Sequence, residues 1–356
     1  MAAFPESNKG STGAMINSHW LPVVWGFIIA FVIFAYVTLD GFDLGVGVLF
    51  AAERERDERN IMVDSIAPVW DGNETWLVLG GSFLYGAFPV AYSVILPAVY
   101  PVIITMLMAL ILRGVSFEFR FRAATERGRR NWDVGLMSGS IIAGFCQGVI
   151  LGAVLHGIPV SNMQFAGGAL RWFSYFSIFT GFAVVLAYAF LGSTWLIWRT
   201  DGRLQARMRK IAAKLAVAML GLVLVFSCWT PMLHHGFAQR WFSGTGVLAT
   251  ALASLVLIFL FYCLFHGLRK IGVTKRDWAP FAFAIAIFLV NFAGVGYSLY
   301  PNIVPPNLTL WRAASPVSSQ LFLLIGAGVM IPVIVGYNIF AYYVFRGKID
   351  ASTYYH

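Results

Sequence analysis

Long runs of apolar residues constrain the fold of this chain more than any other feature of its sequence. A helix needs about 20 apolar residues to cross a hydrocarbon core of roughly 30 Å, and such runs recur between charged segments from residue 20 to residue 345. Hydrophobic residues make up 59% of the chain and charged residues only 12%, which leaves too little polar surface for a soluble globule of 356 residues. The sequence therefore predicts an all-α, polytopic membrane protein.

We expect nine transmembrane helices, arranged as two four-helix bundles plus one peripheral helix. The first four and the next four spans share the same alternation of basic and neutral connections, which favours this arrangement. The apolar runs predict helices at residues 20–50, 64–86, 90–113, 133–156, 172–198, 208–230, 246–268, 278–300 and 318–345.

The connections between the spans are too short for a separate soluble domain. The longest has fewer than about 25 residues, so residues 19–348 are expected to form a single transmembrane helical domain. Residues 1–18 are polar and lack the basic start and short apolar core of a cleaved signal. We expect a polar N-terminal extension there and a cytoplasmic tail at residues 349–356.

Lys and Arg residues fall mainly into alternate connections. One side holds 21 of the 25, including all six from Arg113 to Arg130, and the other side holds 4. Because basic loops are retained in the cytoplasm, the N-terminus is predicted to lie outside and the C-terminus in the cytoplasm. This bias explains the formal net charge of +9, so no nucleic-acid partner is expected.

Neither the cysteines nor the histidines are spaced as metal ligands. The three cysteines lie far apart in apolar runs and fit neither a disulfide framework nor a zinc site. The six histidines all lie near predicted helix ends. His156, His234 and His235 share the outer side and have the chemistry to bind a haem or a quinol, but interfacial histidine is the commoner reason for such positions. No metal site and no haem ligand are expected in this chain.

Four acidic residues lie within or against the first two predicted spans: Asp40, Asp43, Asp71 and Glu74. A carboxylate at bilayer depth costs on the order of 3 kcal/mol, so such acids generally face a bundle interior, a cavity or an ion path. Each pair is spaced by three residues and projects from one helix face. Asp43 and Asp71 would lie roughly 10 to 14 Å from the inner surface. Because a carboxyl group shielded from water can exchange its proton near neutral pH, this placement suggests a proton entry route from the cytoplasm.

A structural interpretation of the same stretch stays open. The segment DGFDLGVG, residues 40–47, combines Asp and Gly as helix ends do, so its aspartates could cap or hydrate the end of the first helix. That alternative is weaker for Asp71, which has apolar residues on both sides. Gly41 and Gly45 have the spacing that lets a neighbouring helix approach closely.

Three segments resemble the signature sequences of subunit II of cytochrome bd-type quinol oxidases. They are TLDGFDLGVGVL (residues 38–49), IMVDSIAPVWDGNETWLVL (61–79) and NLTLWRAASPVSSQ (307–320). The similarity covers almost the whole chain after Met15, and the joint occurrence of DGFD and APxWDGNxxW is highly specific. The short length and the GFCQG segment at 144–148 resemble the branch that includes the cyanide-insensitive oxidases.

The resemblance implies a respiratory terminal oxidase of the bacterial plasma membrane. In this family quinol is oxidised near the outer face, and dioxygen is reduced to water with protons from the cytoplasm. Subunit I holds the b-type and d-type haems and forms a heterodimer with subunit II, sometimes with small accessory subunits. Subunit II binds no redox haem, although some relatives hold a structural quinone in it. The chain would therefore support subunit I and provide a cytoplasm-facing proton path.

The resemblance also implies roles for single residues. Asp71 would belong to the proton path that leads to the haem-bearing subunit, with Asp43 and Asp40 as nearby members. Glu74 belongs to the same motif, at a position where some relatives have Gln. The supporting motif residues are Trp70, Asn73, Gly41 and Gly45.

Two other classes of protein would also place acids at bilayer depth. A proton-coupled secondary transporter is the main alternative, but transporters usually show inverted repeats and interrupted helices, and no clear repeat is seen in this sequence. A haem-binding catalytic subunit is the other. Visible absorption of the purified protein and of any partner distinguishes the three.

Overall fold

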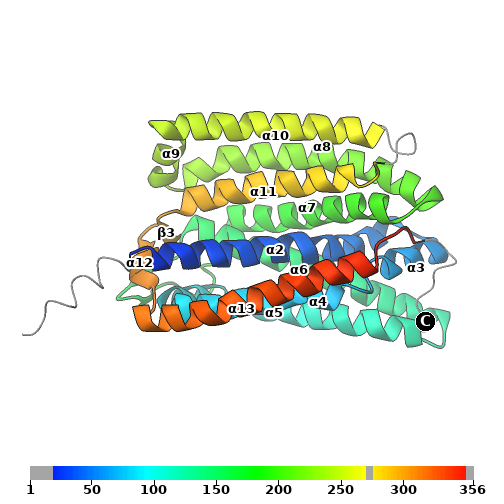
Figure 1. The fold of residues 1–356 in the computed structure, drawn as a ribbon, viewed down its shortest axis with the longest axis horizontal. Helices are drawn as coiled ribbons and strands as arrows, with labels where there is room; N and C mark the ends of the chain where they lie inside the picture. The colour runs from blue at the N-terminus through cyan, green and yellow to red at the C-terminus, as the bar shows by residue number, and fades with distance from the viewer. Residues whose placement is uncertain (1–18, 270–275, 350–356) are drawn as a thin grey trace, which may run out of the picture.

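The computed structural model describes residues 19–269 and 276–349, in which nine long helices lie along the longest axis of the molecule (Figure 1). Their bounds are α2 Leu21–Leu49, α4 Trp70–Ala87, α5 Pro89–Arg122, α6 Glu126–His156, α7 Tyr175–Arg199, α8 Gly202–Leu233, α10 Thr245–Arg269, α11 Ala279–Leu299 and α13 Val317–Val344. Each corresponds to one predicted span. The predicted extension at residues 1–18 and residues 350–356 of the predicted tail lie outside the described residues.

Within the described ranges, eight helices are long and apolar enough to cross a membrane. The remaining long helix is α4, which has 18 residues and begins with a polar segment that contains Asp71, Asn73 and Glu74. It packs against α2, α5 and α13, so its polar side chains are partly enclosed by other helices. The chain is an all-α, polytopic membrane protein, as the sequence predicts.

The long helices form two groups of four. One group contains α2, α4, α5 and α6, and the other contains α7, α8, α10 and α11. The groups meet where α2 and α6 pack against α7, and α13 lies outside them against α4 (Figure 1). The predicted arrangement of two four-helix bundles with one peripheral helix is confirmed.

Helices α2 and α7 approach so closely that each needs a glycine at the contact. A Cβ atom on Gly45 would overlap the backbone of Tyr188 and Gly192, and one on Gly192 would overlap the backbone of Gly45. Gly41, one turn earlier on α2, faces the Tyr188 ring. Small residues permit this contact between helix backbones, so the close approach predicted from Gly41 and Gly45 is confirmed.

Short elements join the helices at both ends. At the end where α2 finishes, here called the basic end, they are the 3-10 helix η1 Phe50–Ala52 and α3 Arg56–Asp64. At the opposite end they are α9 His235–Phe242, α12 Leu310–Ala313 and two antiparallel hairpins, β1 Val160–Ser161 with β2 Gln164–Phe165 and β3 Asn302–Val304 with β4 Leu308–Thr309. Val160 pairs with Phe165, and Asn302 pairs with Thr309.

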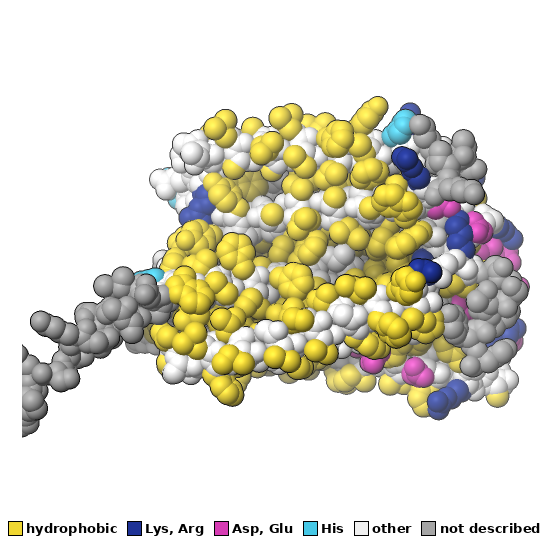
Figure 2. Space-filling model, viewed as in Figure 1, with side chains coloured by type: hydrophobic (Ala, Val, Ile, Leu, Met, Phe, Trp, Pro, Cys, Tyr) yellow, Lys and Arg dark blue, Asp and Glu magenta, His cyan; other side chains and the backbone are white. Residues whose placement is uncertain are grey.

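Polar and apolar side chains separate along the long axis of the molecule. Apolar side chains cover most of the visible face between the ends, whereas most of its Lys, Arg, Asp and Glu side chains gather at the basic end (Figure 2). This end holds the connections that the sequence assigns to the cytoplasm. The assignment of that end to the cytoplasm remains a prediction from the positive-inside rule.

A buried carboxylate fixes the connection between α2 and α3 at the basic end. Glu53 accepts hydrogen bonds from the backbone N–H of Arg54 at 2.7 Å and from Arg207 Nη1 at 3.0 Å. Arg59 donates to the Glu53 carbonyl oxygen at 2.8 Å and forms an ion pair with Asp133 at 3.0 Å. These contacts connect the start of α3 to α6 and α8.

Residues 345–349, here called the C-terminal strap, cross from α13 to the ends of α7, α8 and α11. The contacts are the Ile349 N–H to the Arg199 carbonyl oxygen (2.8 Å) and Lys348 Nζ to the Asp201 and Asp277 carboxylates (2.6 and 2.5 Å). Partial burial opposes the charge on Lys348, but hydrogen bonds to the two carboxylates outweigh it and raise the pKa of the ammonium group above its ordinary value. The strap contact is therefore retained at neutral pH and is lost only as the pH rises through that raised pKa.

Four predicted helix boundaries are wrong. Helices α6 and α8 begin at Glu126 and Gly202, earlier than the predicted starts at 133 and 208. The other two boundaries affect the polar residues of the first bundle. The span predicted at 64–86 is interrupted, because α3 ends at Asp64 and α4 begins at Trp70. Pro68 lies between them, lacks a backbone N–H and disfavours helical backbone at the residue before it. The span predicted at 90–113 continues to Arg122. Arg113 therefore lies inside α5 and not in a cytoplasmic connection.

Candidate functional site

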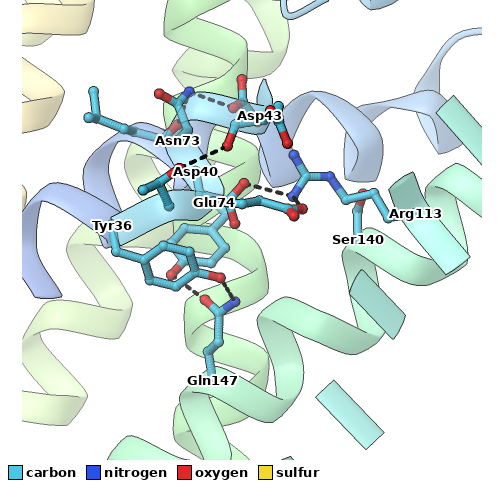
Figure 3. Close-up of polar contacts among 12 residues, drawn as sticks. Tyr36, Asp40, Asp43, Asn73, Glu74, Arg113, Ser140 and Gln147 are labelled. Carbon is cyan, nitrogen blue, oxygen red and sulfur yellow. Dashed lines mark hydrogen bonds and ion pairs between the residues drawn. The ribbon is translucent and has the colours of Figure 1, made fainter. Parts of the chain in front are cut away.

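A buried ion pair lies at the centre of the candidate site. Arg113 Nη1 donates to Asp40 Oδ1 at 2.7 Å and to Glu74 Oε1 at 3.2 Å (Figure 3). The Asp40 and Arg113 side chains are 0% and 1% exposed, whereas that of Glu74 is 28% exposed. The three side chains come from α2, α5 and α4. Removing charges from water is costly, so such a group persists only where opposite charges and hydrogen bonds compensate it.

A second carboxylate lies one turn away on α2 and is held by an amide. Asn73 Nδ2 donates to Asp43 Oδ2 at 2.7 Å and to the Leu39 carbonyl oxygen at 3.3 Å. The Tyr342 hydroxyl donates to Asn73 Oδ1 at 3.0 Å. Asp43 and Asn73 are both buried. The Asn73 side chain thus connects α2, α4 and the peripheral helix α13.

A third polar contact lies about one turn of α2 away from Asp40, towards the opposite end of the bundle. Gln147 Nε2 on α6 donates to the Tyr36 hydroxyl at 2.7 Å, and the Tyr188 hydroxyl on α7 donates to Gln147 Oε1 at 2.6 Å. Tyr36 lies four residues before Asp40 on α2, so their side chains are neighbours on one helix face. Tyr36, Asp40 and Asp43 form a polar stripe along α2 (Figure 3). The side chains bonded around this stripe come from α4, α5, α6, α7 and α13.

The site residues predicted from the sequence do not all lie in this buried cluster. Asp40 and Asp43 are buried and Glu74 is half-buried, but Asp71 is exposed on the surface of the chain, in the first turn of α4. Trp70 is half-buried and stacks obliquely on Phe117, with ring centroids 5.2 Å apart. The supporting residues Gly41 and Gly45 act through the contact between α2 and α7 described above.

Sequence reasoning missed five residues of the site: Tyr36, Arg113, Gln147, Tyr188 and Tyr342. Arg113 was assigned to a loop because it stands at the end of an apolar run, although apolar and aromatic residues continue after it. Gln147 lies inside the apolar helix that contains GFCQG, where an amide needs hydrogen-bond partners. Tyr36 is four residues from Asp40, a spacing that could have identified it.

The part of the chain that the structure describes contains no cluster of metal-ligating side chains. No group of three or more His, Cys, Asp and Glu side chains there could hold a metal ion. His234 Nε2 lies 3.1 Å from the Leu155 carbonyl oxygen, so this histidine already contacts the backbone at the end opposite to the basic end. That the chain provides no haem ligand remains a prediction.

Comparison with known proteins gives one consistent result. The family model for cytochrome bd terminal oxidase subunit II matches residues 21–345. Cytochrome bd ubiquinol oxidase subunit 2 of Bacillus subtilis (strain 168) is 30% identical in an alignment of 337 residues that covers 92% of this chain and 96% of that protein. Cytochrome bd-I ubiquinol oxidase subunit 2 of Escherichia coli (strain K12) is 28% identical over 375 residues, with 94% and 97% coverage.

A solved structure shares the fold. The bd oxidase from Geobacillus thermodenitrificans aligns with a TM-score of 0.70 and 17% sequence identity, over 92% of this chain and 99% of that one. None of these similarities supports a secondary transporter. The chain belongs to the family of subunit II of the cytochrome bd terminal oxidases.

Proposed function

We propose that this chain conducts protons from the cytoplasm to a haem-bearing partner, subunit I, within a quinol oxidase of the bacterial plasma membrane. The main observation in support is that three carboxyl side chains, those of Asp40, Asp43 and Glu74, surround the buried guanidinium of Arg113. In the proposed complex, quinol is the electron donor, and the b-type and d-type haems of subunit I reduce dioxygen to water.

The charge balance of the cluster supports proton binding. Asp40, Asp43 and Glu74 face the single positive charge of Arg113. If all three carboxyl groups were ionised, two negative charges would remain uncompensated in a region shielded from water. Burial strongly opposes that state, so the cluster favours states in which carboxyl groups hold protons. A site of this kind can accept a proton and release it again.

The exposure of the acids supports a route through the cluster. Asp43 lies six residues before the end of α2, which is about 9 Å from the basic end of that helix. Glu74 is partly exposed, and Asp71 is exposed one turn away from it on α4. A carboxyl group that is exposed to lipid within the membrane is energetically costly. We therefore propose that subunit I covers Asp71 and receives protons there.

The remaining cofactors are assigned to the partner. The described histidines lie near helix ends, and His234 already contacts a backbone carbonyl, so this chain's side chains are not proposed to ligate haem. A structural quinone bound to this subunit is a further expectation from the family, without a residue to place it. Small accessory subunits complete the proposed complex.

Asp71→Asn tests the proposed proton path. The amide keeps the size of the side chain but cannot exchange a proton, so quinol-dependent oxygen uptake is expected to fall about tenfold or more, while the haem absorption spectrum of the purified complex stays unchanged. Asp57→Asn is the matched control, because Asp57 is an exposed acid on α3 outside the cluster. Wild-type turnover in Asp71→Asn would remove this residue from the path, and loss of haem would instead assign it to assembly.

A further inference from the structure

The proposed proton path makes no use of the peripheral helix α13, although Tyr342 of that helix bonds to the cluster. We infer that Tyr342 and Asn73 are positioning residues for Asp43, so that α13 sets the geometry of one carboxyl group of the path. This inference rests on the proposed function, because it takes Asp43 as a member of that path.

The polar start of α4 is the surface on which α13 packs. A Cβ atom on Gly72 would lie 3.2 Å from the Tyr337 ring and 3.4 Å from Asn338 Oδ1. Asn338 is buried, although α13 is otherwise largely apolar. The glycine at position 72 thus lets α13 approach closely, and the next residue, Asn73, comes within hydrogen-bond distance of Tyr342.

The Tyr342 ring is held by helices of both bundles. Its centroid lies 6.5 Å from that of Phe42 on α2 and 6.1 Å from that of Trp195 on α7, both in edge contacts. Its hydroxyl group donates to Asn73 Oδ1 at 3.0 Å, because an amide oxygen can only accept. Packing therefore fixes the ring, and the hydroxyl group in turn fixes the oxygen side of the Asn73 amide.

The Asn73 amide is bonded on both sides. Its nitrogen has two hydrogens, which are donated to Asp43 Oδ2 at 2.7 Å and to the Leu39 carbonyl oxygen at 3.3 Å. Its oxygen accepts from Tyr342. Without the Tyr342 hydroxyl group, the amide would be restrained from the nitrogen side only, and its buried oxygen would lose this donor.

The two oxygens of Asp43 differ in their contacts. Oδ2 is bound by Asn73, whereas Oδ1 is buried and has no hydrogen-bond partner among the described residues. Proton transfer requires the donor and acceptor atoms to lie within about 2.6–3.2 Å of each other, so a small rotation of the carboxyl group takes Oδ1 out of that range. By holding Oδ2, Asn73 and Tyr342 keep Oδ1 in one direction.

Turnover of the assembled complex in H2O and in D2O tests this assignment. Tyr342→Phe removes only the hydroxyl group and keeps the ring in its packing. Quinol-dependent oxygen uptake per haem is expected to fall about three- to tenfold at saturating quinol, while KM for quinol stays unchanged. Because proton transfer then limits the rate, the ratio of turnover in H2O to that in D2O should rise above the wild-type ratio. A complex that is only less stable would keep the wild-type ratio in each intact molecule.

Two further variants complete the test. Tyr343→Phe changes the neighbouring tyrosine, which is exposed, and should alter neither the turnover nor the ratio. Asn73→Leu removes the amide, so adding Tyr342→Phe to it should cause no additional loss, as expected for residues that act in series.

The outcomes separate this inference from the proposed path. Wild-type turnover in Tyr342→Phe, a loss with an unchanged H2O-to-D2O ratio, or additive losses in the double variant overturns the inference. If Asp71→Asn is slow while Tyr342→Phe is not, the path stands and the positioning role fails. Wild-type turnover in Asp71→Asn contradicts the path instead.

Discussion

Arg113 contacts Asp40 and Glu74 from inside an otherwise apolar stretch of α5. A guanidinium group stays charged under all conditions that proteins normally meet, whereas a carboxyl group can lose its charge by binding a proton. The pairing therefore joins one permanent charge to several variable ones. This difference determines which substitutions the cluster can tolerate.

Arg113→Met is expected to destabilise the complex by about 3–5 kcal/mol, because it leaves Asp40 buried without a cation. Adding Asp40→Asn should recover part of that loss, since no uncompensated charge then remains. Thermal unfolding of the purified complex, followed by tryptophan fluorescence, measures both effects. Arg203→Met is the control: its ion pair with Glu55 is exposed and should cost less than about 1 kcal/mol. Equal stability of Arg113→Met and wild type would contradict the role given to Arg113.

Among the helices, the contact between α2 and α7 joins the two bundles and also places the polar stripe of α2. Gly45 and Gly192 remove the side chains that would separate the two backbones. This closeness brings Tyr188 of α7 within reach of Gln147 on α6 and of the cluster on α2. The packing of small residues and the placement of the polar groups are thus one structural feature.

Gly45→Ala should therefore destabilise the protein by about 1–3 kcal/mol, because the added methyl group would overlap the α7 backbone. Gly81→Ala, on α4, has open space around the new Cβ atom and should be neutral or slightly stabilising, as alanine favours a helix over glycine. Chemical denaturation of the two variants side by side measures the difference. Similar losses in both would show that the contact tolerates a side chain.

In the whole molecule, the charges define two different ends of an apolar bundle (Figure 2). Because the long faces of the bundle are apolar, the helices must cross the membrane and cannot lie along its surface. The excess of Lys and Arg in the connections at the basic end then predicts which end faces the cytoplasm.

Cysteine labelling on intact cells tests this orientation. A membrane-impermeant maleimide should label Gly168→Cys, at the end opposite to the basic end, and should label Asp57→Cys only after the cells are opened. Both positions are exposed. The native cysteines, Cys146, Cys228 and Cys263, are replaced by serine in both variants, so that the reagent labels only the introduced thiol. The reverse pattern would invert the predicted orientation.

Much of this architecture could be predicted from the sequence, because the length and hydropathy of a membrane-spanning helix are determined by neighbouring residues in the chain. Every predicted span overlaps a long helix, and the spacing of Gly41 and Gly45 predicted a close helix contact. The partners of a buried charge depend on tertiary packing. Arg113 looked like a loop residue because its partner Asp40 is distant in sequence, and the exposure of Asp71 depends on how α4 rotates against α2 and α13.

The C-terminal strap has a consequence for the order in which the protein is made. Helix α13 docks on α4 in the first bundle, while the strap binds the ends of α7, α8 and α11 in the second. Because α13 and the strap follow both bundles in the chain, they form a contact that closes only after both halves are inserted. A chain truncated before Phe345 would complete its insertion yet leave this contact open, so an affinity tag belongs beyond the strap.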